Sequence, residues 1–264
     1  MHSLAVLVAL SALAPGVPVA EATPPGPPPP VMLWAWEWRQ DFSFLAAGER
    51  AGEDVGVAAL LATVRLEPEG PRVIPRRQML RVPPGTYLEA VVRIEIPRRS
   101  ARLARTDLDE RARSAILATF RTAARRPGVR VVQCDFDAPA SLRAAYRALL
   151  VEIRAALPAG VGLTMTALGS WCAFDGAWLE GARDVVDDVV PMLFNMGTGA
   201  EGVWRDVAAT GDLRVAACRH SVGVATYEAH PPLPRGMRRL YLFHGGAWDR
   251  DVLAKALERE ERSR

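Results

Sequence analysis

The sequence predicts an α/β fold, an irregular (β/α)8 barrel of the TIM type. Three observations predict it: a length of 264 residues, apolar strand-like runs alternating with helical stretches from residue 31 onward, and no Gly-rich phosphate loop after an early strand. Such a barrel needs about 250 residues. Parallel strands joined by right-handed crossovers form either a closed barrel or an open doubly wound sheet, and the open sheet is the alternative.

Eight apolar runs are the expected strands. They are rich in Val, Leu and Ala, as strands buried on both faces are. In chain order they are residues 31–36, 55–64, 87–96, 129–137, 161–168, a run within 185–196, a run within 215–227 that is interrupted near His220, and 240–243.

Helical spacing of apolar residues predicts the helices between these strands. The expected helices are residues 44–50, 109–124, 141–157, 201–209 and 249–262. Between the second and third strands no helix is expected, because Pro68, Pro71 and Pro75 forbid one. A Glu-Pro-Glu-Gly turn signal begins at Glu67, so we predict that a hairpin over residues 67–77 replaces the helix.

The first thirty residues are expected to lie outside the barrel. Residues 4–14 form an apolar run too short to span a bilayer, and Ala20-Glu21-Ala22 fits a small-x-small cleavage site. We therefore predict a signal peptide over 1–22, a Pro-rich spacer over 23–30 and a single barrel domain over 31–264. The protein is then exported to the periplasm or the extracellular space, with no stable membrane insertion after cleavage. The alternatives are an uncleaved anchor or a misassigned start of the sequence.

Three cysteines allow one disulfide and one free thiol. Cys172 and Cys218 are the expected pair, since both lie in loop-like stretches, whereas Cys134 lies mid-strand. No Cys/His spacing is typical of zinc, so no metal and no cofactor are expected. The net charge is only +3, and the densest basic run, residues 98–105, holds no aromatic residue. Nucleic-acid binding is therefore not expected.

The fourth strand carries the strongest chemical signal. Gln133, Asp135 and Asp137 alternate along it, so all three face the barrel interior near the mouth. Two neighbouring inward carboxylates repel each other, which raises the pKa of one and makes a general acid. We expect Asp135 to stay charged and Asp137 to hold the proton. The alternative is that these carboxylates cap the helix beginning near Ser141.

Other strand ends place polar and aromatic groups on the same rim. These groups are Glu37, Glu95, Asn195, Glu228, Trp171 and Trp248. Carboxylates for acetal chemistry and flat rings for the apolar face of a sugar are what a glycan site needs. Simple packing of the tryptophans under loops is the alternative. A Ser-His-Asp triad finds no support, because no Gly-x-Ser-x-Gly elbow precedes a helix.

Five motifs resemble an uncharacterised bacterial family, the domain of unknown function 3142. They are MLWAWE at 32–37, LRVPPGT at 80–86, QCDFDA at 133–138, SWC at 170–172 and VPMLF at 190–194. The resemblance covers nearly the whole chain after the signal peptide and implies no particular reaction.

A more distant resemblance is to the chitinase-like glycoside hydrolases of family 18. Their fourth strand ends in D-x-D-x-E and their sixth carries M-x-Y-D, which residues 133–137 and 192–195 resemble. The resemblance implies that Asp137 is the general acid, that Asp135 orients the substrate's acetamido group, and that Trp248 floors the sugar site. The departures are Asp137 for Glu, Gln133 for the first Asp, and Phe-Asn for Tyr-Asp. A register with Pro139 in the acid position would leave no active site.

Together these features predict a glycoside hydrolase-like protein that acts on an envelope or extracellular polysaccharide by carboxylate general acid/base chemistry. Its partner is then a carbohydrate. The alternative is a non-catalytic carbohydrate-binding or structural envelope protein on a degenerate barrel.

Overall fold

Eight parallel strands close into a barrel in the computed structural model, which describes residues 28–46, 54–97 and 107–262. Strand β1 (Val31–Ala35) pairs in parallel with both β3 and β11, and this closes the sheet. The other barrel strands are β3 (Val55–Glu67), β6 (Leu88–Glu95), β7 (Val129–Phe136), β8 (Gly162–Leu168), β9 (Asp188–Met192), β10 (Ser221–Ala225) and β11 (Arg239–Phe243). The predicted barrel is confirmed, and the open sheet is excluded.

Several predicted features fall outside the described residues. They are the signal peptide over 1–22, residues 23–27 of the spacer and the basic run over 98–105. Within the described ranges, no helix combines the length and the apolar character that a membrane span needs. The signal peptide, its cleavage and export stay predictions.

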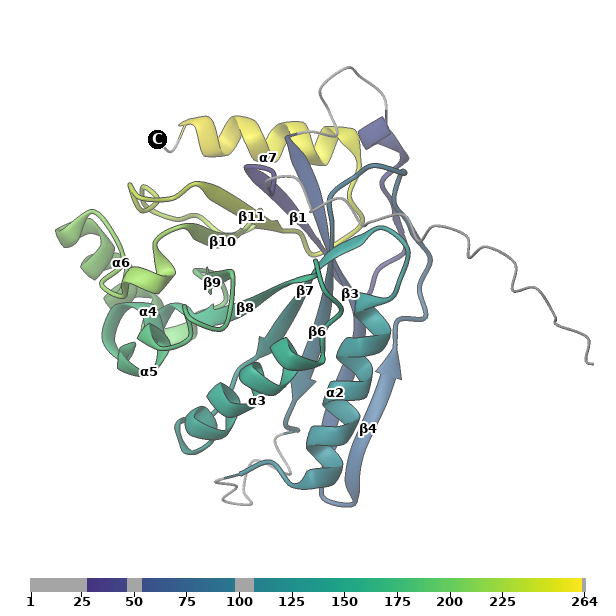
Figure 1. The fold of residues 1–264 in the computed structure, drawn as a ribbon. Helices are drawn as coiled ribbons and strands as arrows, with labels where there is room; N and C mark the ends of the chain where they lie inside the picture. The colour runs from purple at the N-terminus through teal and green to yellow at the C-terminus, as the bar shows by residue number, and fades with distance from the viewer. Residues whose placement is uncertain (1–27, 47–53, 98–106, 263–264) are drawn as a thin grey trace, which may run out of the picture.

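The longest helices cover one side of the barrel, where α2 (Glu110–Ala124) and α3 (Arg143–Ala156) lie side by side (Figure 1). The Asp109 side chain caps α2 by accepting the Ala112 N–H at 2.8 Å. Helix α3 buries one apolar stripe at helical spacing, from Tyr146 to Ile153. Two further helices are α6 (Ala200–Thr210) and α7 (Arg250–Arg262).

Elsewhere the helical layer is thinner than expected. The segment predicted as a helix over 44–50 contains the 3-10 turn η1 (Ser43–Ala46), and residues 47–50 lie outside the described ranges. Two short helices that the sequence pattern did not indicate, α4 (Gly169–Phe174) and α5 (Ala177–Glu180), follow β8. Further 3-10 turns are η2 (Ala140–Leu142), η3 (Gly197–Gly199) and η4 (Ala216–Cys218).

A hairpin stands where the second barrel helix would be. Strand β4 (Gly70–Pro75) pairs antiparallel with β3, from Glu67 opposite Gly70 to Ala62 opposite Pro75. The predicted hairpin is therefore confirmed. Strand β4 lies beside α2 (Figure 1). A separate two-stranded parallel pair is formed by β2 (Gln40–Asp41) and β5 (Leu80–Arg81).

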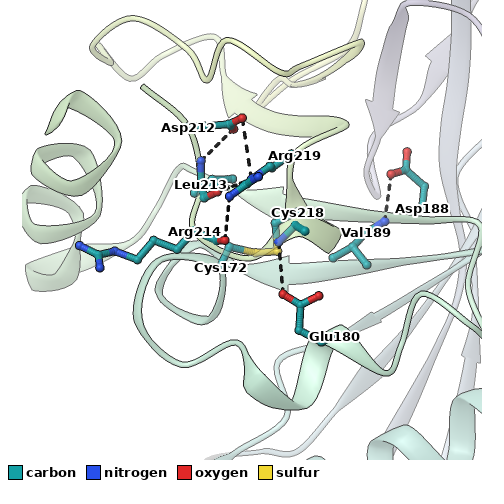
Figure 2. Close-up of a disulfide and its surroundings, with 10 residues drawn as sticks. Cys172, Glu180, Asp188, Val189, Asp212, Leu213, Arg214, Cys218 and Arg219 are labelled. Carbon is teal, nitrogen blue, oxygen red and sulfur yellow. Dashed lines mark hydrogen bonds and ion pairs between the residues drawn. A yellow bond between two sulfur atoms is a disulfide. The ribbon is translucent and has the colours of Figure 1, made fainter. Parts of the chain in front are cut away.

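A disulfide joins Cys172 of α4 to Cys218 of η4, across 46 residues (Figure 2). This is the pair expected from the sequence, and Cys134 is free and buried. Arg219, next to Cys218, donates to the Leu213 carbonyl at 2.8 Å (Figure 2). This hydrogen bond and the disulfide together fix the segment before β10. The disulfide thus anchors α4, the segment that directly follows β8.

Candidate active site

The barrel interior contains a buried polar network. Glu89 of β6 is completely buried and accepts hydrogen bonds from the Tyr241 hydroxyl at 2.9 Å, the Thr164 hydroxyl, and the Gln133 amide at 3.3 Å. Gln133 in turn accepts the Trp34 indole N–H at 2.8 Å. Five barrel strands therefore meet through hydrogen bonds, and Gln133 is held by neighbours rather than free to turn.

A pocket of about 440 Å³ opens above this network, at the C-terminal ends of the strands. The three β7 residues predicted to face inward, Gln133, Asp135 and Asp137, all line it. Its other lining residues come from six segments: Trp34, Trp36, Arg93, Thr166, Leu168, Gly169, Ser170, Met192, Phe194, Asn195, Met196, Gly199, Val203 and Phe243. The pocket therefore lies where barrel enzymes hold their reacting groups.

The two aspartates differ in their surroundings. Asp135 is 6% exposed, and the Thr166 hydroxyl donates to its Oδ1 at 2.8 Å. Its other oxygen, Oδ2, lies 3.7 Å from Nε of Arg93. Asp137 is exposed at the rim, beyond the last residue of β7. Asp135 is thus a positioned carboxyl on the pocket floor, and Asp137 is a carboxyl open to a ligand.

The surrounding protein shifts the pKa of both aspartates. Burial raises the pKa of Asp135 to about 6, and the neighbouring charge of Asp137 adds to the rise against Arg93 and Thr166. Desolvation by the surrounding protein also raises the pKa of Asp137, opposed by Arg93. Both shifts favour the protonated forms, so which of the two carboxyls holds the proton stays a prediction.

Helix capping does not explain Asp137. The turn η2 has Pro139 at its N-cap and α3 has Leu142, and neither helix start has a side-chain cap. Pro139 does not line the pocket, whereas Asp137 does. The capping alternative is therefore wrong for this structure, and a register with Pro139 in the acid position would put that position outside the pocket.

The aromatic walls come from residues other than the two predicted tryptophans. Phe194 and Phe243 stack at 5.1 Å between ring centroids, and Trp36 meets Phe243 edge-on at 5.9 Å. Trp171 is 3% exposed and packs against Trp178 in the core under the helices.

Trp248 is also 3% exposed, and its indole N–H donates to the Trp34 carbonyl at 2.9 Å. Neither Trp171 nor Trp248 lines the pocket. Packing, the simpler expectation, therefore accounts for both of these tryptophans.

The predicted rim carboxylates also lie outside the pocket. Glu37 is exposed beyond the end of β1, and Glu95 forms an ion pair with Arg65 at 3.0 Å. Glu228 accepts the backbone N–H of Asn195 with both oxygens, at 3.0 and 3.1 Å. Asn195, the amide predicted at the same rim, does line the pocket. These three glutamates are thus not pocket residues, and Glu228 supports the pocket through Asn195.

Sequence reasoning did not assign Arg93, Trp36, Thr166 or Phe243 to the site. Arg93 and Thr166 share the inward parity of their strands, so strand alternation was the signal that could have found them. Trp36 lies just beyond the end of β1, two residues after the pocket residue Trp34, so the same alternation also indicated it. Among the described residues, no group of three or more His, Cys, Asp or Glu side chains is placed to hold a metal ion.

The chain is similar to two solved structures of the spore cortex-lytic enzyme SleL. The Bacillus cereus enzyme has 18% identity and a TM-score of 0.48 over 77% of this chain and 53% of that chain. The Bacillus megaterium QM B1551 enzyme has 13% identity and a TM-score of 0.49 over 78% and 53%. This chain spans about half the length of both enzymes, 53% in each case. No family model and no curated protein matches it, so the resemblances to domain 3142 and to family 18 stay predictions.

Proposed function

We propose that the pocket binds a glycan and that Asp137, with Asp135, cleaves a glycosidic bond in it. The protein is then a glycoside hydrolase-like enzyme acting on an envelope or extracellular polysaccharide. The observation that carries the proposal is that two carboxyls share one aromatic-walled pocket: Asp137, which is exposed and caps no helix, and Asp135, which is buried. The Cys172–Cys218 disulfide supports the exported location, since disulfides persist in oxidising compartments.

The chemistry follows from the two environments. A glycan lying over Asp137 removes its water, which raises the pKa of this carboxyl further and favours its protonated form. Asp137 then donates its proton to the glycosidic oxygen as the bond from that oxygen to C1 breaks, and water adds to C1 and returns a proton to the Asp137 carboxylate. Asp135, held by Thr166, faces the same space and orients the group that attacks C1.

The test is a screen for hydrolysis of chitin oligosaccharides, peptidoglycan fragments and extracellular polysaccharides, followed by Asp137→Asn on the substrate found. The variant keeps the shape of the side chain but has no transferable proton, so turnover should fall roughly 100-fold or more. Thermal unfolding and glycan binding should stay close to wild type. Glu37→Gln, an exposed rim acid outside the pocket, is the matched control and should keep full turnover.

A non-catalytic glycan-binding role is the second candidate, and the hydrogen bonding of two pocket amides favours it. Gln133 is held by Trp34 and Glu89, and the Asn195 amide donates to the Tyr227 hydroxyl at 2.9 Å. Amides at these positions supply hydrogen bonds but no proton. Glycan binding without hydrolysis, unchanged in Asp137→Asn, would establish this second role in place of the first.

A further inference from the structure

Arg93 is the one cationic side chain among the described residues that line the pocket. Its guanidinium lies 5.7 Å from the ring centroid of Trp36, and the Arg93 side chain as a whole is 37% exposed. Its nearest acidic atom is Oδ2 of Asp135, 3.7 Å from Nε. That separation is too long for a hydrogen bond. The guanidinium therefore lines the pocket with N–H groups that can donate to a ligand.

Two other arginines show what full pairing looks like in this molecule. Arg65 donates through Nε to Glu95 at 3.1 Å, and its Nη2 lies 3.0 Å from the same carboxylate. Arg214 reaches both oxygens of Asp206 through Nε, at 2.8 and 2.9 Å. Among the described residues, no side chain or carbonyl gives the Arg93 guanidinium a comparable hydrogen bond. Since an arginine fork matches a carboxylate with two parallel bonds, Arg93 is an unfilled position for such a group.

The neighbouring acids limit what that group is. Asp135 and Asp137 line the same pocket, so a doubly charged anion such as a phosphate monoester meets more repulsion there than a single carboxylate does. The rings of Trp36, Phe194 and Phe243 supply an apolar wall on which a sugar ring packs. A flat apolar wall beside one exposed guanidinium fits a sugar that bears a carboxylate.

We propose that the pocket selects a glycan whose bound sugar carries a carboxylate, and that Arg93 is the residue that holds this group. The proposal rests on the proposed function only in that the pocket binds a glycan. It does not depend on whether the glycan is hydrolysed.

The experiment measures binding by calorimetry for two matched probes: an oligosaccharide of hexuronic acids, and the same oligosaccharide after reduction of its carboxylates to hydroxymethyl groups. Wild type should bind the acidic probe roughly 10-fold or more tightly than the neutral one, as expected for a hydrogen bond between charged groups. Arg93→Gln should remove this preference by weakening binding of the acidic probe roughly 10-fold more than binding of the neutral probe. Arg93→Lys, which keeps the charge but not the fork, should keep part of the preference.

Arg65→Gln is the matched control, because Arg65 has a similar side-chain exposure of 35% but lies outside the pocket. It should leave the preference intact, which separates a specific contact from general attraction to basic surface. A third probe, the reduced oligosaccharide carrying sulfate esters, tests whether any anion suffices; binding as tight as that of the carboxylate probe would overturn the assignment to a carboxylate.

Equal affinity of wild type for the acidic and neutral probes would also overturn the inference, as would an equal loss of both in Arg93→Gln. Its failure is distinguishable from failure of the proposed function. Hydrolysis of a neutral glycan, with no preference for an acidic one, would support the proposed enzyme and contradict the role of Arg93. A preference for the acidic probe without any hydrolysis would support the role of Arg93 and contradict the proposed enzyme.

Discussion

Glu89 and Asp135 are inward-facing acids on adjacent strands of one barrel, yet their surroundings differ. Glu89 accepts hydrogen bonds from three side chains, those of Tyr241, Thr164 and Gln133. Asp135 accepts one, from Thr166, and its other oxygen faces the pocket and Arg93. An acid whose oxygens are occupied by the protein supports the fold, whereas an acid with an unoccupied oxygen is available to a ligand.

The same contrast extends to the two ends of the barrel. At the N-terminal end, Arg239 forms a salt bridge with Asp188, and Asp188 also accepts the Ser221 hydroxyl. At the C-terminal end, Arg93 and the two pocket aspartates are only loosely paired. These N-terminal charges are thus paired with one another, whereas the charged groups of the pocket at the C-terminal end are open to a ligand. The predictions below test this difference, from the largest expected effect to the smallest.

Replacing the arginine at each end should give very different losses of stability. Arg239→Met leaves the buried Asp188 without its partner, and the free energy of unfolding should fall by about 3–5 kcal/mol. Arg93→Met should lower it by less than about 1 kcal/mol, because Arg93 is partly exposed and its ion pair is long. Urea unfolding of both variants measures the difference. Equal losses would remove the contrast between the two ends.

Glu89 should make stability depend on pH. Burial raises its pKa from 4.5 to about 7, so the folded state holds a proton that the unfolded state releases between these values. Stability of the wild type should therefore fall as pH rises from about 4.5 to about 7 and change little from this group above that.

The test is Glu89→Gln, which keeps the size of the side chain and removes its charge. The variant should be more stable than wild type by roughly 1–3 kcal/mol at pH 8 and should gain nothing at pH 4.5. Chemical denaturation at both pH values measures this. A variant that is less stable at pH 8 would show that the hydrogen bonds to the ionised carboxylate outweigh its burial.

Asn195 at the pocket rim should give the smallest effect. Its φ of 51° lies in the left-handed region, which Asn and Gly tolerate and Ala does not. Asn195→Gly removes the backbone strain of the left-handed conformation but loses the hydrogen bond to Tyr227. Its free energy of unfolding should therefore stay within about 1 kcal/mol of wild type. Asn195→Ala should be less stable than the Gly variant by about 1 kcal/mol. The reverse order would mean that the backbone conformation does not control stability here.

The regular parts of the barrel were predictable because their physical signals are local. Buried parallel strands favour continuous apolar runs, and proline disrupts the interior of a helix, as closely spaced Pro71 and Pro75 would here. Alternation along β7 placed Gln133, Asp135 and Asp137 in one pocket for the same reason.

The rest of the site depended on contacts between distant segments. Glu37 follows Trp34 and Trp36 with the opposite parity and lies outside the pocket, so its place at a strand end was not enough to assign it to the site. A register shift in β3 between Leu60 and Ala62 precedes the pairing of Arg65 opposite Glu95. The ion pair between them engages Glu95, which the sequence predicted as a rim acid of the site. The pKa shifts of Asp135 and Asp137 depend on burial by the surrounding protein and on the charge of Arg93, which lies on a different strand.

The hairpin that replaces the second barrel helix has a consequence for self-association. The Arg76 N–H donates to Leu61 in β3, so by alternation the N–H groups of residues 72 and 74 point the same way, and positions 71, 73 and 75 face outward. Two of these three are prolines, which leaves Val73 as the one outward backbone donor of β4. An open strand edge is a template for a second chain, and this edge lacks most of the donors that such a chain would need. The irregular part of the barrel is therefore protected against edge-to-edge aggregation.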